Sequence, residues 1–311
     1  MPPRQDSTFA RRRINAIRLS PDGSQFALFE GERSDLCIMT LEGTRRVLRT
    51  FTATPTAWDM FFPATPPVWS PDGKQIAFIS LKGSKASTPD NRIIEDYSTA
   101  LVILEAQTGR LVSRHELPEA SMGGFSKNFR WSPNGQRILL SIQGLLVIDV
   151  RTGKTQVISD SRSTAADWNR GGTGIFYLEE DSRGLSFRDL ARSTAITLDN
   201  VRRSPKFHIR PVFGGIAVSP NGTKLAVAGA GTLRIYQLEK TAKILSDKLL
   251  KSYTIDNIVL DLEWSPDESR LVIATNPRAR LQIINLNDDS SKTVGSLTGP
   301  GGHYKMLSWT R

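Results

Sequence analysis

The sequence predicts an all-β protein, a β-propeller of four-stranded antiparallel blades, with six blades expected and seven as the alternative. Two observations support this prediction. A turn motif of the type Ser-Pro-Asp-Gly recurs along the chain at an average spacing of about 48 residues, and short apolar strands follow each copy at matching places. Four strands in each such repeat are typical of propeller blades. No long segment has the 3.6-residue periodicity of an amphipathic helix.

The recurring turn has five clear copies, a degenerate one and a truncated one. The clear copies begin at Ser20, Ser70, Ser132, Ser219 and Ser265, the degenerate copy at Asn169 and the truncated one at Thr310. Proline fixes φ for the first corner of a type I turn, Asp or Asn suits the second corner, and glycine takes the left-handed position that closes the hairpin. Each copy should therefore join two antiparallel strands.

The residues on either side of the turn repeat as well. Five of the six tryptophans stand immediately before a copy of the turn: Trp69, Trp131, Trp168, Trp264 and Trp309. A second strand opens six residues after the start of each complete copy, as at Ile76 and Leu271. Third strands are expected at 36–41, 101–104, 145–150, 185–190, 233–238 and 281–286, and fourth strands at places such as 155–158 and 242–245.

The pattern apolar-x-Trp-Ser-Pro-Asp-Gly-x-x-apolar is best matched around Trp69, Trp131 and Trp264, and it resembles the WD-like repeats of TolB-type β-propeller proteins. The resemblance covers residues 14–311 and implies a fold, because the matching residues are turn and core residues. TolB itself has an additional α/β domain before its propeller. This chain leaves no room for one, so we do not expect a TolB-like role in the envelope.

Two arrangements of the first blade are open. Chains that resemble TolB end on a strand that completes their first blade, and this resemblance implies that residues 304–309 complete the blade of residues 24–48. The segment Ile14–Leu19 also has the pattern of an inner strand. If both segments are used, a seventh, incomplete blade results.

The domain organisation follows from the repeat. We expect a basic N-terminal arm at residues 1–13 and a single propeller domain at 14–311, with insertions near 82–96 and 200–211. The first insertion is rich in Gly, Ser, Lys, Pro and Asp, and we expect a protruding loop there between the second and third strands of its blade. Insertions on a rigid scaffold are natural carriers of partner contacts.

The charge of the chain favours an acidic partner. The chain carries 41 Lys and Arg against 31 Asp and Glu, a formal net charge of +10. Such a surface attracts acidic proteins, nucleic acids or anionic membranes, although it can also serve solubility alone. The basic clusters that lie outside the repeat core supply the partner-binding residues that we expect: Arg11, Arg12, Arg13, Arg202, Arg203, Lys206, His208 and Arg210.

No motif predicts a catalytic, cofactor or metal site. The histidines His115, His208 and His303 are far apart, and none has a second His or Cys at ligand spacing. Residues 287–289 lack the alternating oxygen ligands of a calcium loop and are expected to form a turn. A Gly-x-Ser-x-Gly elbow and a phosphate-binding glycine loop are both absent. The single cysteine, Cys37, stands in an apolar run and is expected in the core.

These observations favour a non-catalytic protein-interaction scaffold that docks an acidic protein partner or the subunits of a larger complex. One alternative is a nucleic-acid-associated propeller, since the cluster Arg45, Arg46 and Arg49 and the segment around Phe207 carry arginines and an aromatic ring. The other is a small-molecule or sugar-active enzyme with its site at the central channel. No apolar run is long enough to span a membrane, and no signal peptide is apparent. We expect a cytoplasmic protein, or a periplasmic one if the sequence is a processed form.

Overall fold

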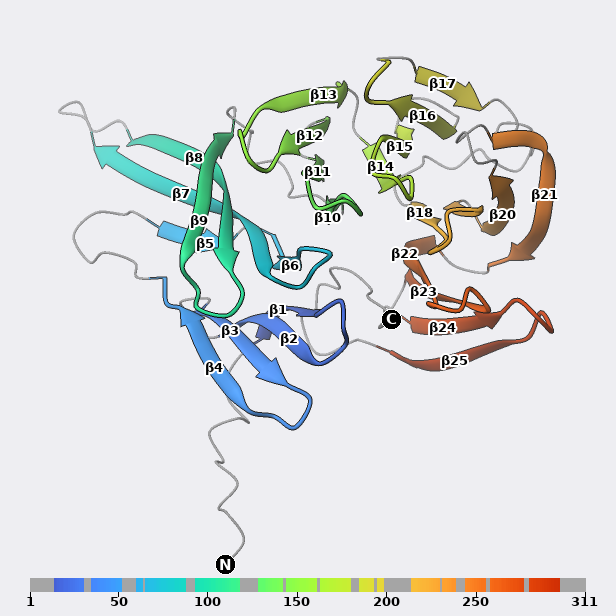
Figure 1. The fold of residues 1–311 in the computed structure, drawn as a ribbon, viewed down its shortest axis with the longest axis horizontal. Coiled ribbons are helices and arrows are strands. Elements are labelled where there is room, and N and C mark those ends of the chain that lie inside the picture. The colour runs from blue at the N-terminus through green and yellow to red at the C-terminus, as the bar shows by residue number, and fades with distance from the viewer. Residues whose placement is uncertain are drawn as a thin grey trace, which may run out of the picture. The chain divides into compact units, whose positions relative to one another are not determined.

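The computed structural model describes residues 14–30, 35–51, 60–63, 65–87, 93–117, 128–141, 144–160, 163–179, 185–192, 195–198, 214–229, 231–238, 244–255, 258–276 and 280–296. These residues contain strands and turns and no helix, so none of them forms a helix that could cross a membrane. The strands form six antiparallel sheets, the blades of a six-bladed β-propeller, as predicted (Figure 1). The chain divides into two compact units, Met1–Ala120 and Ser121–Arg311.

Unit 1 contains blades 1 and 2. Blade 1 consists of β1 (Ile14–Leu19), β2 (Gln25–Glu30), β3 (Asp35–Thr40) and β4 (Arg45–Arg49), paired in that order. The place beside β2 that the resemblance assigns to residues 304–309 is taken by β1, because β2 pairs with β1 on one side and with β3 on the other. The hairpin turn that begins at Ser20 connects β1 directly to β2, and such a local pairing needs no distant segment. Residues 304–309 lie outside the described residues.

Blade 2 has an interrupted inner strand. Its strands are β5 (Met60–Pro63), β6 (Val68–Trp69), β7 (Gln75–Ser87), β8 (Ile93–Glu105) and β9 (Leu111–Leu117). Both β5 and β6 pair with β7, and Pro66 and Pro67 lie between them without an N–H to donate. At this break the N–H of Ile79 donates instead to the side-chain oxygen of Thr65, at 3.0 Å. The side chain thus replaces a main-chain partner.

The predicted loop at 82–96 is largely wrong. The ladder between β7 and β8 continues through this region, from Gly83 opposite Tyr97 to Ser87 opposite Ile93. The Gly and Ser content suggested a loop, but backbone pairing does not depend on large side chains, and Ile93 and Ile94 are strand formers. The tip at 88–92 lies outside the described residues, as does the second predicted insertion at 200–211.

Unit 2 contains blades 3 to 6, each paired in chain order. Blade 3 consists of β10 (Phe129–Trp131), β11 (Arg137–Ser141), β12 (Leu145–Asp149) and β13 (Thr155–Ser159). Blade 4 consists of β14 (Ser163–Trp168), β15 (Gly174–Glu179), β16 (Leu185–Asp189) and β17 (Ala195–Leu198). Blade 5 consists of β18 (Gly214–Val218), β19 (Lys224–Gly229), β20 (Thr232–Leu238) and β21 (Ile244–Thr254). Blade 6 consists of β22 (Ile258–Trp264), β23 (Arg270–Asn276), β24 (Arg280–Asn285) and β25 (Ser291–Ser296).

The predicted third strands are confirmed, but the fourth strand of blade 5 is much longer than predicted. Instead of 242–245, β21 runs from Ile244 to Thr254, and its register shifts opposite Tyr236. A bulge adds an unpaired residue to one strand of a pair, and β21 continues beyond the irregularity.

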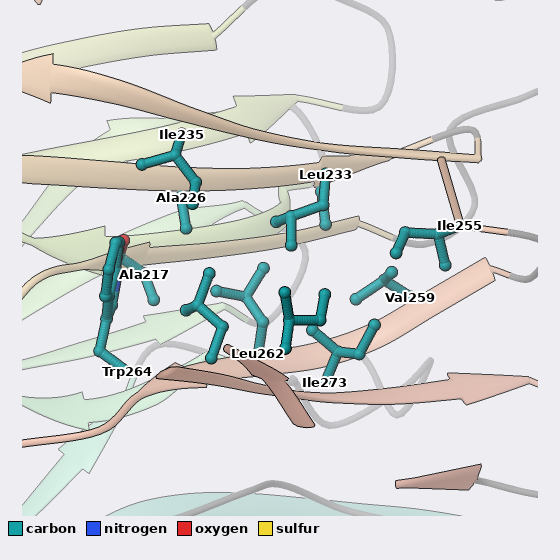
Figure 2. Close-up of a cluster of buried hydrophobic side chains, with 12 residues drawn as sticks. Ala217, Ala226, Leu233, Ile235, Ile255, Val259, Leu262, Trp264 and Ile273 are labelled. Carbon is teal, nitrogen blue, oxygen red and sulfur yellow. Dashed lines mark hydrogen bonds between the residues drawn. The ribbon is translucent and has the colours of Figure 1, made fainter. Parts of the chain in front are cut away.

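The blades within each unit pack face to face through apolar side chains. In unit 1, the Phe29 ring of blade 1 meets the Phe78 ring of blade 2 edge-on, with 5.4 Å between centroids. In unit 2, buried clusters join blade 3 to blade 4, blade 4 to blade 5, and blade 5 to blade 6. Figure 2 shows the last cluster, in which Leu262 and Trp264 of blade 6 face Ala217 and Ala226 of blade 5. Burial of such surface is the main favourable contribution to folding.

The repeat turns have the geometry that their sequence predicts. In the first copy, the N–H of Gly23 donates to the carbonyl of Ser20 at 2.9 Å, and Gly23 has a φ of 74°. The Ser20 hydroxyl donates to the Asp22 carboxylate at 2.5 Å and accepts the N–H of Gln25 at 3.0 Å. The copies at Ser70, Ser132, Ser219 and Ser265 repeat this network.

Candidate functional site

The repeated tryptophans connect neighbouring blades. The indole N–H of Trp264 donates to the carbonyl of Ala217 in the preceding blade at 2.9 Å. Two other tryptophans make the same bond at 3.3 Å, from Trp168 to the carbonyl of Arg130 and from Trp69 to that of Arg18. In each case the acceptor stands two residues before the turn motif of the preceding blade. These tryptophans therefore join each blade to the preceding one.

Side chains of three inner strands form a cluster of charges in unit 2. The guanidinium of Arg130 on β10 lies 3.9 Å from Asp167 on β14. It lies 3.5 Å from Asp261 and 3.6 Å from Glu263, both on β22. The side chains of Arg130 and Asp167 are only 17% and 14% exposed. The cluster ties blades 3, 4 and 6 together at their inner strands.

The electrostatics of the cluster are set by burial and by opposite charge. Burial raises the pKa of Asp167, against the effects of Arg130 and of two backbone N–H donors, those of Val218 and Trp168. Burial opposes the charge on Arg130 too, but the carboxylates Glu263, Asp167 and Asp261 outweigh it and raise the pKa of the guanidinium. Arg130 therefore stays protonated.

Sequence reasoning found no acid pair, whereas the structure brings three carboxylates together around Arg130. Two of them, Asp167 and Glu263, stand two residues before their turn motifs, at the same place in the repeat as Arg130. Opposite charges at one place in several repeats are a signal that could have been found in the sequence. All three carboxylates contact Arg130, so the arrangement neutralises a partly buried arginine. Among the described residues, no group of His, Cys, Asp and Glu has the arrangement of a metal site.

The exposed turns of unit 2 form a second feature of interest. In each blade, the motif turn and the turn between the third and fourth strands lie at the same end, which we call the turn end. Backbone bonds join the two turns, from Val150 to Gln136 in blade 3 and from Leu190 to Thr173 in blade 4, both at 3.0 Å. The turn end is thus a continuous surface within each blade.

Hydrogen bonds also connect the turn ends of successive blades. The side-chain amide of Asn134 in blade 3 donates to the carbonyl of Gly171 in blade 4 at 3.4 Å. Arg170 in blade 4 donates to the carbonyl of Asn221 in blade 5 at 2.8 Å. The N–H of Asn221 donates in turn to the carboxylate of Glu268 in blade 6 at 2.6 Å. The four turn ends therefore form one hydrogen-bonded series.

Charges are segregated along this series. The turn ends of blades 3 and 4 carry a four-cation patch of exposed side chains: Arg151, Lys154, Arg170 and Arg192. The two nearby carboxylates face their own turns. Asp149 accepts the N–H and hydroxyl of Thr152 at 2.8 and 2.7 Å, and Asp189 accepts the N–H groups of Ala191 and Arg192 at 2.9 and 3.2 Å.

The turn end of blade 6 is acidic by contrast. Its exposed carboxylates belong to Asp267, Asp288 and Asp289. Hydrogen bonds from Ser265 and Ser269 lower the pKa of Asp267 to about 2. A bond from Ser290 lowers the pKa of Asp288, and contacts with Lys251 and Tyr253 lower that of Asp289. These groups are ionised at neutral pH.

The partner-binding residues predicted from the sequence, at 11–13 and 202–210, all lie outside the described residues. Of the third basic cluster, Arg45 pairs with Glu30 and contacts the thiol of Cys37, and Arg46 donates to the carbonyls of Ala106 and Gln107. This cluster is thus partly engaged in structural contacts. The four-cation patch was missed because its members are far apart in the chain. Aligning the turns of the repeats would have found it.

Comparison with known proteins supports the fold. No protein-family model matches the sequence, and no curated protein sequence matches it. Among solved structures, the β-propeller domain of Cps50 (Swd1) from Myceliophteria thermophila is similar with a TM-score of 0.64 and 13% identity, over 96% of this chain and 89% of that one. A chain of the Mitotic Checkpoint Complex is similar with a TM-score of 0.61 and 14% identity, over 94% of this chain and 79% of that one. KlHsv2 with loop 6CD replaced by a Gly-Ser linker is similar with a TM-score of 0.59 and 12% identity, over 96% of this chain and 86% of that one. These neighbours are WD40-type propellers, and at such identities the likeness concerns the fold.

Proposed function

We propose that this protein is a non-catalytic interaction scaffold that binds an acidic protein partner or holds the subunits of a larger assembly. The observation that supports the proposal is the interlocked turn end of unit 2, where exposed cations stand on turns that are hydrogen-bonded to one another. Such a surface is rigid before binding, and preorganisation lowers the entropic cost of association. One of the similar propellers is a chain of the Mitotic Checkpoint Complex, which is consistent with a role in assembly.

The basic residues outside the described part of the chain remain part of this proposal. We propose Arg11, Arg12, Arg13, Arg202, Arg203, Lys206, His208 and Arg210 as further contact residues. Reversing the charges of Arg202, Arg203 and Arg210 should weaken capture of the partner and leave the thermal unfolding midpoint nearly unchanged. Unaltered capture would reject the assignment.

The scaffold proposal is tested with the full chain as bait. Proteins retained from an extract of the native cell at low and at moderate salt are identified by mass spectrometry, purified, and mixed with the chain. We expect at least one of them to form a complex of fixed stoichiometry in light scattering, and we expect that complex to weaken as salt screens exposed charges. If no purified candidate forms a stoichiometric complex, the scaffold proposal fails.

A second candidate function rests on the carboxylates around Arg130. Enzymes that cleave glycosidic bonds use one carboxylic acid and one carboxylate, and the burial that raises the pKa of Asp167 works in the direction that a general acid needs. Against this function, Asp167 contacts both Arg130 and two backbone N–H groups. The variant Asp167→Asn distinguishes the two functions. An enzyme would lose turnover of a glycoside library, whereas a scaffold shows no turnover in either form and keeps its partner.

A further inference from the structure

We propose that the four-cation patch of Arg151, Lys154, Arg170 and Arg192 is the docking surface for an acidic segment of a partner protein. This inference rests on the proposed scaffold function and specifies its surface and the chemistry of its partner. Arginine presents a planar fork of N–H donors that matches a carboxylate, and lysine adds a mobile point charge. The patch thus suits a short run of Asp and Glu side chains.

The first support is that the four cations belong to one surface. Arg151 and Lys154 stand on the second turn of blade 3, which bonds to the motif turn through Val150 and Gln136 at 3.0 Å. That motif turn bonds to the motif turn of blade 4 through Asn134 and Gly171 at 3.4 Å. In blade 4, Arg170 belongs to this motif turn, and Arg192 stands on the second turn, joined to it by the bond from Leu190 to Thr173 at 3.0 Å. A series of hydrogen bonds thus connects the turns that carry all four cations.

The second support is that none of these four cations forms an ion pair among the described residues. Arg151 is near enough to Asp149 to help lower the pKa of that carboxyl group, but the two side chains are not paired. The acids next to them, Asp149 and Asp189, accept hydrogen bonds from their own turns. Arg170 spends one N–H on the carbonyl of Asn221 at 2.8 Å, which holds the guanidinium in place while its other donors stay available.

The third support concerns the choice between a protein and a nucleic acid. Nucleic acids bound as single strands stack their bases on aromatic side chains, but among the side chains described on blades 3 and 4 the exposed large apolar one is the aliphatic Val157. A long polyanion that crossed the turn end would also approach the carboxylates of Asp267, Asp288 and Asp289 in blade 6. A short acidic segment can remain on blades 3 and 4. The charge segregation therefore favours an acidic peptide.

The test measures binding of a fluorescent octaglutamate peptide to the full chain by anisotropy. The test variant combines R151Q, K154Q, R170Q and R192Q. The matched control combines R49Q, R270Q, R280Q and K292Q, which removes the same number of positive charges from exposed positions outside blades 3 and 4. Each exposed ion pair contributes a factor of about 1.4 to 5 to an equilibrium constant. We expect the test variant to bind roughly tenfold or more weakly and the control to stay within about threefold of the wild type.

Two further measurements, and one outcome of the comparison above, make the result decisive. A variant with R151Q, K154Q and R192Q alone keeps the contact between Arg170 and Asn221. If this variant binds octaglutamate more weakly, the loss cannot come from a broken contact between blades 4 and 5. Equal losses in the test and control variants would overturn the proposal, since net charge alone would then explain binding. The proposal would also be overturned if an oligodeoxythymidine bound the wild type more tightly than octaglutamate does and lost that binding in the test variant. The patch would then be a nucleic-acid surface.

The native partner separates this proposal from the scaffold function. If the wild-type chain forms a stoichiometric complex with a captured protein and the test variant forms it equally well, the patch assignment fails and the scaffold function stands. If the test variant loses the complex and the control variant keeps it, the patch is the docking surface.

Discussion

The indole N–H of Trp264 and the carbonyl of Ala217 form a buried hydrogen bond of 2.9 Å between blades 6 and 5. In Figure 2 the indole of Trp264 lies beside Ala217 at one end of the apolar cluster. The residue that identifies the repeat in the sequence is thus the residue that joins one repeat to the previous one. A hydrogen bond inside an apolar cluster also fixes the register of the two blades, because a shifted blade would leave a buried carbonyl without a donor.

Replacement of Trp264 by phenylalanine should lower the free energy of unfolding by about 1–3 kcal/mol, because the carbonyl of Ala217 loses its donor in a buried place. Trp69→Phe is the matched control. Trp69 makes the corresponding bond at 3.3 Å and is only half-buried, so its replacement should cost less. Urea unfolding followed by circular dichroism measures both. A larger loss for Trp69 than for Trp264 would contradict this account of the joint.

Glu268 takes the place of the turn glycine with a φ of 58°, and its side chain contacts both Asn221 and Lys224 of blade 5. A left-handed conformation costs a non-glycine residue roughly 1–2 kcal/mol. Glu268→Ala keeps this cost and loses both contacts, whereas Glu268→Gly loses the contacts and the cost. We expect the glycine variant to be more stable than the alanine variant by about 1 kcal/mol in urea unfolding. Equal stability of the two variants would mean that the backbone at Glu268 is not strained.

The sequence was sufficient to predict the strands because their signals are local. A proline and a glycine at fixed places define each turn, and the strands next to the turn must then be antiparallel. The prediction failed at 82–96 because it was based on amino-acid composition. The ladder from Gly83 to Ser87 continues there in spite of small and polar residues. In the first blade, too, the local pairing is the one that forms, since Ile14–Leu19 pairs with the strand that follows it in the chain.

The charge cluster and the four-cation patch were not predicted because each depends on distant positions. Arg130 meets Asp261 only when blades 3 and 6 bring their inner strands together. In the same way, Arg151 and Arg170 share a surface only because one turn of blade 3 bonds to a turn of blade 4. A single sequence position does not show which distant residues it will meet. An alignment of the repeats with one another would show which side chains occupy equivalent places in their blades.

Cys37 was expected in the core, and the structure confirms this with a side chain that is 0% exposed. Burial raises the pKa of its thiol to about 12, and nearby Glu30 adds to the effect. Because the thiolate is the reactive form, we expect Ellman's reagent to leave the native protein unlabelled at pH 8 and to label one thiol per chain after unfolding in guanidinium chloride. Rapid labelling of the native protein would show that β3 opens readily.

The final prediction concerns Arg130 and the pH. Arg130→Met leaves Asp167 partly buried without its cation and should lower the free energy of unfolding by about 3–5 kcal/mol at pH 7.5. Arg130→Lys, which keeps the charge, is the control and should lose less.

The sign of the pH dependence follows from Asp167. Its pKa is raised above 3.8 in the folded protein, so the stability that its protonation provides is present at low pH and is lost as the pH rises through the folded pKa. Because Arg130 lowers that pKa, its removal raises it further, and the folded variant takes up its proton at a higher pH. The difference in unfolding free energy between Arg130→Met and the wild type should therefore shrink from pH 7.5 to pH 5, and adding Asp167→Asn should recover part of the loss at pH 7.5. A difference that grows on acidification would show that Arg130 does not neutralise Asp167.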